Sequence, residues 1–381
     1  MKSLREIVES SPGMRAVAMR SLRMEDKAEA LGPSRWDWQS IQRILVVRLR
    51  SIGDTVLTTP SLVALRRFLP EVQIDILLED WVAPVLEGFP HINNVITMER
   101  RRTTSRARVA RQIRATGYDV VYNLHGGTTA TLLTRATGAT HRVGYAHYQY
   151  ARLHNHQAPS SAELWGKAKT HSVEQQLALL GWTGVPVSDR PATQLTVTEA
   201  AAATVAEKLQ TAGIDDTTPF AVVHPAAAFE TKRWAIEKYA RVVEHLAAKG
   251  LITVAITTPA ELALVKGLAK HSASPVKGLT DLSLPEVSAL LSRARLFVGN
   301  DSGIAHIAAA VSAPVVVIFG SSNVAHWGPW SSAPAETVLE EMDCQPCPGY
   351  FCAEFEQPEC IRRVPVERVT AAIDRVLKEA A

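Results

Sequence analysis

A single carboxylate follows the first strongly apolar segment of the chain. The run RILVVRLR (residues 43–50) precedes SIGD, so Gly53 and Asp54 come directly after an expected strand. Glycine lets another chain segment approach the backbone closely. A lone aspartate at such a position is suited to act as a general base that takes a proton from an attacking hydroxyl group. The alternative is that Asp54 caps the helix that follows.

A second segment is suited to bind a phosphate. In GNDSGIAHIAAA, an expected helix begins at Asp301, Ser302 and Gly303. The free backbone N–H groups and the positive dipole end of a helix N-terminus favour an anion. Ser302 can also donate its hydroxyl, and His306 lies four residues later on the same helix face. Ordinary capping by Asp301 or Ser302 is the alternative.

The loop HPAAAFETKRW (residues 224–234) adds a cationic element. Its small residues let a ligand approach the backbone, and Thr231, Lys232 and Arg233 follow them. A lysine there can neutralise a departing diphosphate, whereas a solvated Lys–Arg pair before a helix is the alternative. Because both anion-binding segments occur in the same half of the chain, together they indicate one nucleoside diphosphate.

Two common nucleotide-binding motifs do not occur in the sequence. There is no GxGxxG after an expected strand and no GxxxxGK[ST]. Their absence disfavours dinucleotide-dependent oxidoreductases and P-loop enzymes.

The elements that must position these residues alternate regularly between strands and helices. Expected strands are residues 43–50, 73–78, 118–124 and 141–145, then 219–225, 251–258, 295–300 and 314–320. Expected helices are residues 56–68, 104–115 and 128–137, then 234–249, 260–271, 284–292 and 302–311. This alternation predicts parallel sheets covered by helices on both faces. Ligands of such sheets bind beyond the carboxyl ends of the strands, where the residues described above lie.

The length of 381 residues favours two domains. We expect an N-terminal extension (1–40), a first Rossmann-like domain (41–190), a second one (191–340), and a C-terminal segment with four cysteines and a helix (341–381). Residues 184–194, rich in Pro, Gly and polar groups, are the expected linker.

Composition excludes several classes of protein. Apolar residues make up 46% of the chain and charged residues 21%, as in ordinary globular proteins. The formal charge of +3 gives no argument for a nucleic-acid partner. Residues 302–335 have no Asp, Glu, Lys or Arg, but prolines, glycines and a histidine interrupt them, which favours a buried helix, turn and strand over a membrane span.

The first thirty residues lack the continuous apolar stretch of a signal peptide, so we expect a cytoplasmic protein. Their apolar spacing fits amphipathic helices that pack against the body or stay disordered. Contact with an anionic membrane through Arg15, Arg20 and Arg23 is the alternative.

Five ordered segments resemble glycosyltransferase family 9, the ADP-heptose:lipopolysaccharide heptosyltransferases. They are RILVVRLRSIGDTVLTTPSLVALRRFLP, YDVVYNLHG, HRVGY, VVHPAAAFETKRW and FVGNDSGIAHIAAAVSAPVVVIFGSS, and they span roughly residues 41–330. The resemblance implies the GT-B architecture, in which two Rossmann-like domains with parallel sheets face an interdomain cleft. It also implies inverting transfer of heptose from ADP-heptose to a lipopolysaccharide core acceptor, with the acceptor on the first domain and the donor on the second.

The resemblance assigns individual roles on the donor side. Asp54 matches the proposed general base, and Lys232, beside Thr231, matches the lysine that contacts the diphosphate. Glu261 matches a glutamate near the nucleoside, although Thr258 replaces the glycine usual before it. The family's phosphate-binding helix start is matched by Asp301, Ser302, Gly303 and His306, where many members have Thr in place of Ser302.

On the acceptor side, the resemblance implies Gly53, the loop residues His125 and Gly126, and nearby Arg142. The implied acceptors are anionic glycolipids at the inner face of the cytoplasmic membrane, and arginine suits their carboxylates and phosphates. Seven arginines fall within fifteen residues, as either an acceptor-binding group or a solvated helix face: Arg100, Arg101, Arg102, Arg106, Arg108, Arg111 and Arg114. The resemblance further implies that the C-terminal helix packs back across both domains.

The four cysteines Cys344, Cys347, Cys352 and Cys360 form the pattern C-x2-C-x4-C-x7-C. They satisfy the ligand count of a structural zinc or iron site, with free thiols as the alternative. No cofactor is expected to be required for catalysis.

Three other functions remain open at this point. The first is a GT-B transferase that uses another nucleotide sugar or a protein acceptor of the autotransporter type. The second is a non-catalytic nucleotide-sugar-binding protein, against which Asp54 and Lys232 argue. The third is an epimerase on the same architecture.

Overall fold

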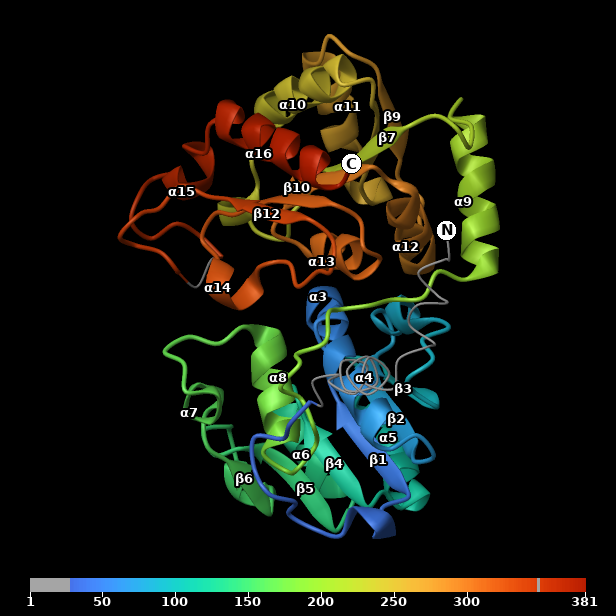
Figure 1. Cartoon of the computed structure of the whole chain (residues 1–381), viewed down its shortest axis with the longest axis vertical. Coiled ribbons are helices and arrows are strands. Elements are labelled where there is room, and N and C mark those ends of the chain that lie inside the picture. The colour runs from blue at the N-terminus through green and yellow to red at the C-terminus, as the bar shows by residue number, and fades with distance from the viewer. Residues whose placement is uncertain (1–27, 348–349) are drawn as a thin grey trace, which may run out of the picture.

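The computed structural model describes residues 28–347 and 350–381, which form two halves, one above the other in Figure 1. Each half contains a six-stranded sheet in which every neighbouring pair is parallel. The predicted α/β class with two Rossmann-like halves is confirmed. The amphipathic helices expected within residues 1–27 lie outside the described residues.

The N-terminal half is built around the strand order β3-β2-β1-β4-β5-β6. Its strands are β1 (Arg43–Val47), β2 (Gln73–Glu79), β3 (Asn94–Met98), β4 (Val120–Asn123), β5 (His141–Tyr145) and β6 (His156–Ala158). Its helices are η1 (Trp38–Ser40), α3 (Ile52–Val56), α4 (Thr59–Phe68), η2 (Ala83–Leu86), α5 (Thr103–Thr116), α6 (Thr128–Ala136), η3 (Ala151–Leu153), α7 (Ser161–Trp165) and α8 (Ser172–Gly181).

The C-terminal half repeats this topology with the order β12-β11-β10-β7-β8-β9. Its strands are β7 (Phe220–His224), β8 (Ile252–Ile256), β9 (Val276–Leu279), β10 (Leu296–Asn300), β11 (Val315–Ile318) and β12 (Ala335–Val338). Its helices are α9 (Glu199–Thr211), η4 (Glu230–Lys232), α10 (Ile236–Ala248), η5 (Pro259–Glu261), α11 (Leu262–His271), α12 (Leu284–Arg293), α13 (Gly303–Ala310), α14 (Val324–Trp327), α15 (Glu359–Arg362) and α16 (Val366–Glu379).

The strand order fixes where a ligand can bind. In each sheet the order reverses between the first and fourth strands, β1 and β4 in one half and β7 and β10 in the other. Ligands of doubly wound sheets bind at such switch points, beyond the carboxyl ends of the strands. Asp54 follows β1, His125 follows β4, and Asp301 follows β10.

Both faces of the first sheet are covered by helices because each helix has one apolar stripe. In α5 the buried residues are Ser105, Val109 and Ile113, spaced four apart, so they lie on one side of the helix. Together with residues of α6 they cover one face of the sheet. The opposite face packs against α4 and α8.

The C-terminal helix α16 packs against α10, β11 and β12. Its buried residues, Val369, Ala372, Ile373 and Val376, follow helical spacing and belong to the core of the C-terminal half. The resemblance implied a helix lying across both halves, and the structure corrects this, because the apolar stripe of α16 is covered by one sheet.

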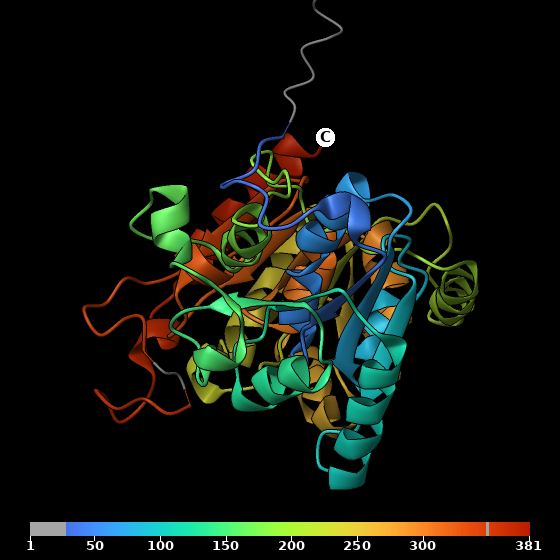
Figure 2. The ribbon, with the colours of Figure 1, turned by 90° about the horizontal axis from the view of Figure 1, so that it is seen from below.

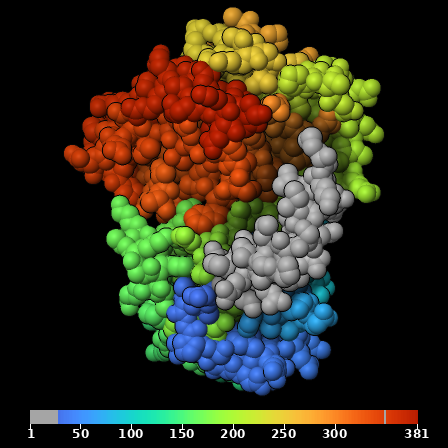
Figure 3. Space-filling model, in the orientation of Figure 1, coloured from blue at the N-terminus to red at the C-terminus, as the bar shows by residue number. Residues whose placement is uncertain are grey.

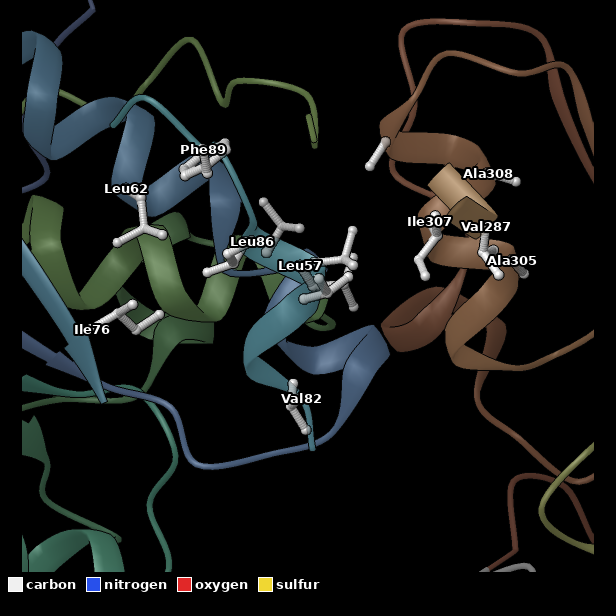
Figure 4. Close-up of a cluster of buried hydrophobic side chains, with 14 of the residues drawn as sticks. Leu57, Leu62, Ile76, Val82, Leu86, Phe89, Val287, Ala305, Ile307 and Ala308 are labelled. Atoms are coloured by element: carbon white, nitrogen blue, oxygen red, sulfur yellow. The ribbon is translucent and has the colours of Figure 1, made fainter. Parts of the chain in front are cut away.

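The two halves share one apolar core. It contains Leu57 and Leu86 from the N-terminal half and Val287, Ala305 and Ile307 from the C-terminal half, on the two sides of the junction in Figure 4. In the space-filling view, the C-terminal half lies against the green segment that contains α7 and α8 (Figure 3). Burial of apolar surface therefore helps to hold the halves together.

Residues 182–198 connect the halves without forming a helix or strand. Within them, the Gln194 N–H donates to Thr59 Oγ1 (3.1 Å) in one half, and the Leu195 N–H donates to the Ala310 carbonyl (3.1 Å) in the other. The segment without charged side chains, residues 302–335, forms α13, β11, α14 and the start of β12. In the part of the chain that the structure describes, no helix has the length and apolar character needed to cross a membrane.

Candidate active site

A pocket of about 600 Å³ lies between the two halves, at their switch points. From the N-terminal half it is lined by the start of α3, and from the C-terminal half by the loops after β7, β8 and β10. The predicted residues in its lining are Gly53, Asp54, Lys232, Glu261, Asp301, Ser302, Gly303 and His306. Segments 250 residues apart in the sequence therefore meet in one cavity, which we call the donor pocket.

The halves meet at the donor pocket through two glycines, at the starts of α3 and α13. A Cβ atom on Gly53 would lie 2.6 Å from Cδ2 of His306, and one on Gly303 would lie 3.1 Å from the Gly53 backbone nitrogen. Real Cβ atoms do not tolerate the first of these distances. The close approach of α3 to α13 thus requires glycine at Gly53.

Asp54 is held from both sides of its carboxylate. Arg48 Nη2 donates to Oδ1, while the backbone N–H and the hydroxyl of Ser51 donate to Oδ2 at 3.0 and 2.9 Å. Burial raises the pKa of Asp54, but Arg48, Ser51 and His306 outweigh it and hold the pKa below the usual value. Asp54 is therefore a carboxylate at neutral pH. The structure corrects the expectation that Asp54 itself is the N-cap of α3: Ser51 is the N-cap, and Asp54 is the third residue of the helix, whose carboxylate accepts the Ser51 N–H in a capping box.

Arg48 connects the two switch-point strands of the N-terminal half. It follows β1, is 8% exposed, and donates through Nη1 to the carbonyl of Leu124, just after β4. Breaking a buried ion pair by removal of one partner typically costs 3–5 kcal/mol, so Arg48 and Asp54 stabilise this corner as a pair.

The start of α13 carries polar atoms that no protein group satisfies. Ser302 Oγ and His306 Nδ1 are buried, and neither has a hydrogen-bond partner within residues 28–347 and 350–381. Burial lowers the pKa of His306, although the nearby carboxylates of Asp301 and Asp54 oppose the effect. Buried polar atoms are normally hydrogen-bonded, so a ligand that hydrogen-bonds to these two atoms fits here.

Lys232, from the loop after β7, places a positive charge beside the start of α13. Its Nζ lies 2.7 Å from Asp301 Oδ2 and 5.6 Å from the ring centre of Phe229. Asn300 fixes the loop that carries it, because its side chain donates to the Pro225 carbonyl (2.8 Å) and accepts the Trp234 N–H (3.1 Å). A cation, a helix N-terminus and two unpartnered polar atoms thus lie in one region of the pocket.

Glu261, in η5 after β8, also lines the donor pocket. Its carboxylate accepts the hydroxyl of Thr258 (2.9 Å), the residue that replaces the family's usual glycine. His224, at the end of β7, also lines the pocket, and its Nδ1–H donates to the Ile256 carbonyl (2.9 Å).

A second pocket, of about 280 Å³, lies on the other side of Asp54. We call it the second pocket; it is lined by Arg48, Arg50, Asp54, Leu124, His125, Tyr145, Tyr148, Ser172, Gln175, Gln176, His326 and Trp327. Most of these side chains can donate or accept hydrogen bonds. Burial and Arg48 lower the pKa of His125 to about 4, so its imidazole is neutral at pH 7. Asp54 and Trp327 line both pockets.

The comparisons with known proteins identify the family. The model of glycosyltransferase family 9 (heptosyltransferase) matches residues 106–356, about two thirds of the chain. The chain belongs to glycosyltransferase family 9. As a member of this family, it is a glycosyltransferase of the heptosyltransferase type.

Individual family 9 proteins are similar over most of their length. Lipopolysaccharide heptosyltransferase 3 of Escherichia coli K12 is 28% identical over 350 residues, covering 87% of this chain and 97% of that protein. A family 9 glycosyltransferase structure from Veillonella parvula matches with a TM-score of 0.77 at 24% identity, covering 89% and 97%. The structure of E. coli ADP-heptose lps heptosyltransferase II matches with a TM-score of 0.73 at 22% identity, covering 89% and 100%.

Not every residue singled out by the family resemblance lines a pocket. Thr231 is 1% exposed and packs behind the loop, where its hydroxyl accepts from Ser321 Oγ (3.0 Å). Gly126 has φ +80° and lies against the ring of Tyr148, so it shapes the second pocket from behind. Arg142 lies at the amino end of β5, away from both pockets, and donates to the carbonyls of Ala139 and Leu153.

Several lining residues were not found from the sequence. Arg48 had a usable signal, since it is a charged residue at the end of an otherwise apolar strand run. The residues from α8 and α14, such as Gln175 and His326, had none, because their segments show no motif and meet only through the contact between halves.

Three of the cysteines, Cys344, Cys347 and Cys352, lie in the loop before α15, and Cys360 lies within α15 close enough to interact electrostatically with them. Burial raises the pKa of the Cys360 thiol, and the other three cysteines raise it further. Among the residues described, however, no three His, Cys, Asp or Glu side chains are grouped so that they could hold a metal ion. The zinc or iron site that the cysteine spacing predicts stays a prediction, and no step of the chemistry is assigned to it.

Proposed function

We propose that this family 9 enzyme transfers heptose from ADP-heptose to a lipopolysaccharide core acceptor with inversion at the anomeric carbon. The single observation that carries the proposal is that Asp54 lines both pockets. One carboxylate can then face the acceptor hydroxyl on one side and the donor sugar on the other. The relative described as an ADP-heptose lps heptosyltransferase supports this choice of donor.

The donor pocket suits a nucleoside diphosphate sugar. The proposed contacts of the diphosphate are Lys232, the start of α13, and the unsatisfied Ser302 and His306 atoms. Charge-assisted hydrogen bonds from such groups stabilise negative charge as it develops on a leaving group. Glu261, which also lines the pocket, is the proposed contact of the nucleoside, while Thr231 is proposed to support the Lys232 loop from behind.

The proposed reaction is one in-line displacement. Asp54 accepts the proton of the acceptor hydroxyl, the hydroxyl oxygen forms a bond to the anomeric carbon, and the bond from that carbon to the phosphate oxygen breaks. ADP leaves with the electron pair, and Lys232 compensates its charge. A single displacement inverts the centre, and no cofactor takes part in any of these steps.

The second pocket is the proposed acceptor site. Arg48, Arg50 and His125 are polar groups beside Asp54, which suits an anionic sugar. The acceptor would be a glycolipid, so we propose that the protein works in the cytoplasm at the inner face of the cytoplasmic membrane. A protein acceptor is the competing possibility within the family.

The decisive experiment measures ADP production by the purified protein with ADP-heptose, with and without a heptose-deficient core acceptor. We expect release that depends on the acceptor, together with a mass gain of one heptose and an inverted anomeric linkage. Donor binding without release with any core acceptor would overturn the proposed acceptor. Release with another nucleotide sugar at a higher rate would overturn the proposed donor.

A further inference from the structure

Positive charge is concentrated in one stretch of the N-terminal half. Residues 100–162 contain ten arginines, no lysine and a single acid, Asp119, which gives a formal charge of +9. Since the whole chain carries +3, the remaining residues sum to −6. The net charge of residues 100–162 is therefore opposite in sign to the net charge of the rest of the chain.

The structure shows that part of this charge lies on one surface. The outward sides of α5 and α6 carry five exposed arginines: Arg106, Arg108, Arg111, Arg114 and Arg135. None of the five has a carboxylate partner among the described residues. Figure 2 shows α5 projecting from the N-terminal half at the rim of the molecule. We call this surface the α5–α6 face.

A shallow groove of about 650 Å³ runs between the two helices on this face. Three alanines and Leu132 contribute its apolar surface, and Arg111, Arg114 and Arg135 are its charged members. The Leu132 side chain is unusually open for an apolar residue, at 53% exposure. The groove thus combines apolar surface with three guanidinium groups.

One of these arginines is positioned by a glycine. Gly138, at the end of α6, has φ +65°, and the guanidinium of Arg114 occupies the space where a Cβ atom would lie. The charge from α5 is therefore seated across the end of α6, beside the groove.

We propose that the α5–α6 face binds the anionic headgroups of a phospholipid bilayer. Guanidinium groups pair with phosphate oxygens in a planar, two-pronged geometry. Clustered basic residues bind anionic lipid surfaces, and an apolar side chain between them can enter the headgroup region. The apolar groove and the exposed leucine favour a bilayer over a nucleic acid, whose single strands are bound largely by aromatic stacking; no aromatic residue lines this groove.

The two ends of α5 show how this face lies relative to the active site. The last residue of α5, Thr116, lies at the amino ends of the strands, where its carbonyl accepts from Arg43, the first residue of β1 (2.9 Å). The first residue of α5, Thr103, lies at the opposite end of the sheet, where four residues separate it from β3 and where α3 and Asp54 also lie. Nearby, Arg100 Nε lies 3.9 Å from Glu79 Oε2 at the end of β2. Arg114 and Arg135 lie in the last turns of α5 and α6, so the groove is at the amino ends of the strands, opposite to the end at which Asp54 lies. A bilayer bound there would contact the N-terminal half away from the second pocket, so the inference does not depend on the proposed acceptor site.

The experiment measures sedimentation of the purified full-length protein with phosphatidylcholine vesicles, with and without phosphatidylglycerol. It needs neither donor nor acceptor, so its failure is distinct from failure of the proposed transfer. The test variant is Arg111→Glu/Arg114→Glu/Arg135→Glu. The matched control is Lys266→Glu/Lys270→Glu/Arg295→Glu, the same change of charge at exposed residues of the C-terminal half.

We expect binding that requires phosphatidylglycerol and weakens with salt. Each basic residue near an anionic surface contributes roughly fivefold to partitioning, so the test variant should lose about 100-fold or more. Leu132→Ser should lose a few-fold, since it removes only apolar contact. The control should retain binding, and thermal melting would confirm that all variants fold.

Three outcomes would overturn the inference. Equal loss in the control variant would mean that only net charge matters, and binding independent of phosphatidylglycerol would remove the role of the headgroups. Arginine-dependent binding to duplex DNA or single-stranded RNA, without binding to vesicles, would assign the face to a nucleic acid instead.

Discussion

The two halves of the molecule have the same strand order but present different chemistry at their switch points. In the N-terminal half, the carboxylate of Asp54 is fully engaged by Arg48 and Ser51. In the C-terminal half, Ser302 and His306 keep polar atoms without a protein partner in the described chain. The polar groups of Asp54 are thus paired within the protein, whereas two polar atoms at the start of α13 are not. Because the two sheets have the same strand order, the loops rather than the sheets determine this difference.

If the N-terminal half supplies the base, Asp54→Asn should produce the largest effect. The amide keeps the shape of the carboxylate but cannot take up a proton, so acceptor-dependent ADP release should fall by about 10²–10⁴-fold. The affinity for ADP, measured by calorimetry, should change by less than about threefold. Activity within about tenfold of the parent enzyme would remove Asp54 as the base.

If the C-terminal half supplies diphosphate binding, Lys232→Gln should affect binding and turnover together. Loss of a charge-assisted hydrogen bond costs about 1.5–3 kcal/mol. The dissociation constant for ADP should therefore rise by roughly 10–100-fold, and transfer should be slower. Lys232→Arg, which keeps the charge, should recover part of both. The surface variant Lys249→Gln is the control, and an unchanged ADP affinity in Lys232→Gln would refute the assignment.

The ion pair between Arg48 and Asp54 can be tested by measuring how transfer activity depends on pH. In Arg48→Met, burial would raise the pKa of Asp54 without the opposing charge. Because Asp54 acts as a base only above its pKa, the acidic limb of kcat/KM should move to higher pH, with about tenfold lower activity near pH 6. Arg50→Met, which alters the same pocket without removing this ion pair, should leave the limb in position.

Substitution of a residue at the contact between the halves should have the smallest effect on the transfer rate. His171 donates through Nε2–H to the Gly328 carbonyl (2.9 Å) across the junction, accepts the Val173 N–H at Nδ1 (3.1 Å), and stacks on Trp330. Burial is the main cause that lowers the pKa of His171 to about 4. The unfolded chain therefore takes up this proton near pH 6.5 and the folded chain only near pH 4.

Stability from His171 is thus complete above pH 6.5 and is lost as the pH falls toward 4, by about 3 kcal/mol. Urea unfolding of His171→Gln should show a flatter dependence in this window, with transfer changed by less than about twofold at pH 7.5. The exposed His147→Gln is the matched control. Curves for the parent and His171→Gln that run parallel from pH 6.5 to 4 would contradict the prediction.

Much of the architecture could be predicted from the sequence because long buried strands and amphipathic helices carry strong patterns. The runs around β1, β7, β10 and β11 are nearly all apolar, and the structure forms strands there. The strands β3, β6, β9 and β12 were missed. They have three to five residues each, and polar residues interrupt their pattern. The Ala-rich helix α9 was also missed, although its residues have high helix propensity.

The sequence predicts the residues of the candidate site better in the C-terminal half than in the N-terminal half. The segments with Lys232, Ser302 and His306 follow strands of one sheet, and the structure brings them together in the donor pocket. The second pocket depends on α8 and α14, which approach each other only when the halves pack. Arg48 follows a run of apolar residues in the sequence, and the carbonyl to which it donates, that of Leu124, lies at the end of a different strand. Such contacts depend on topology, which no local pattern records.

The two glycines at the starts of α3 and α13 also bear on how the enzyme would open. If the halves rotate about Gly53 and Gly303, that contact is the fulcrum, and displacement grows with the length of the lever arm. Asp54 and His306, beside the fulcrum, would then move little, while the outer rims of the pockets would swing the furthest. Substrates could enter and leave through these rims while the reacting groups stay aligned from one turnover to the next.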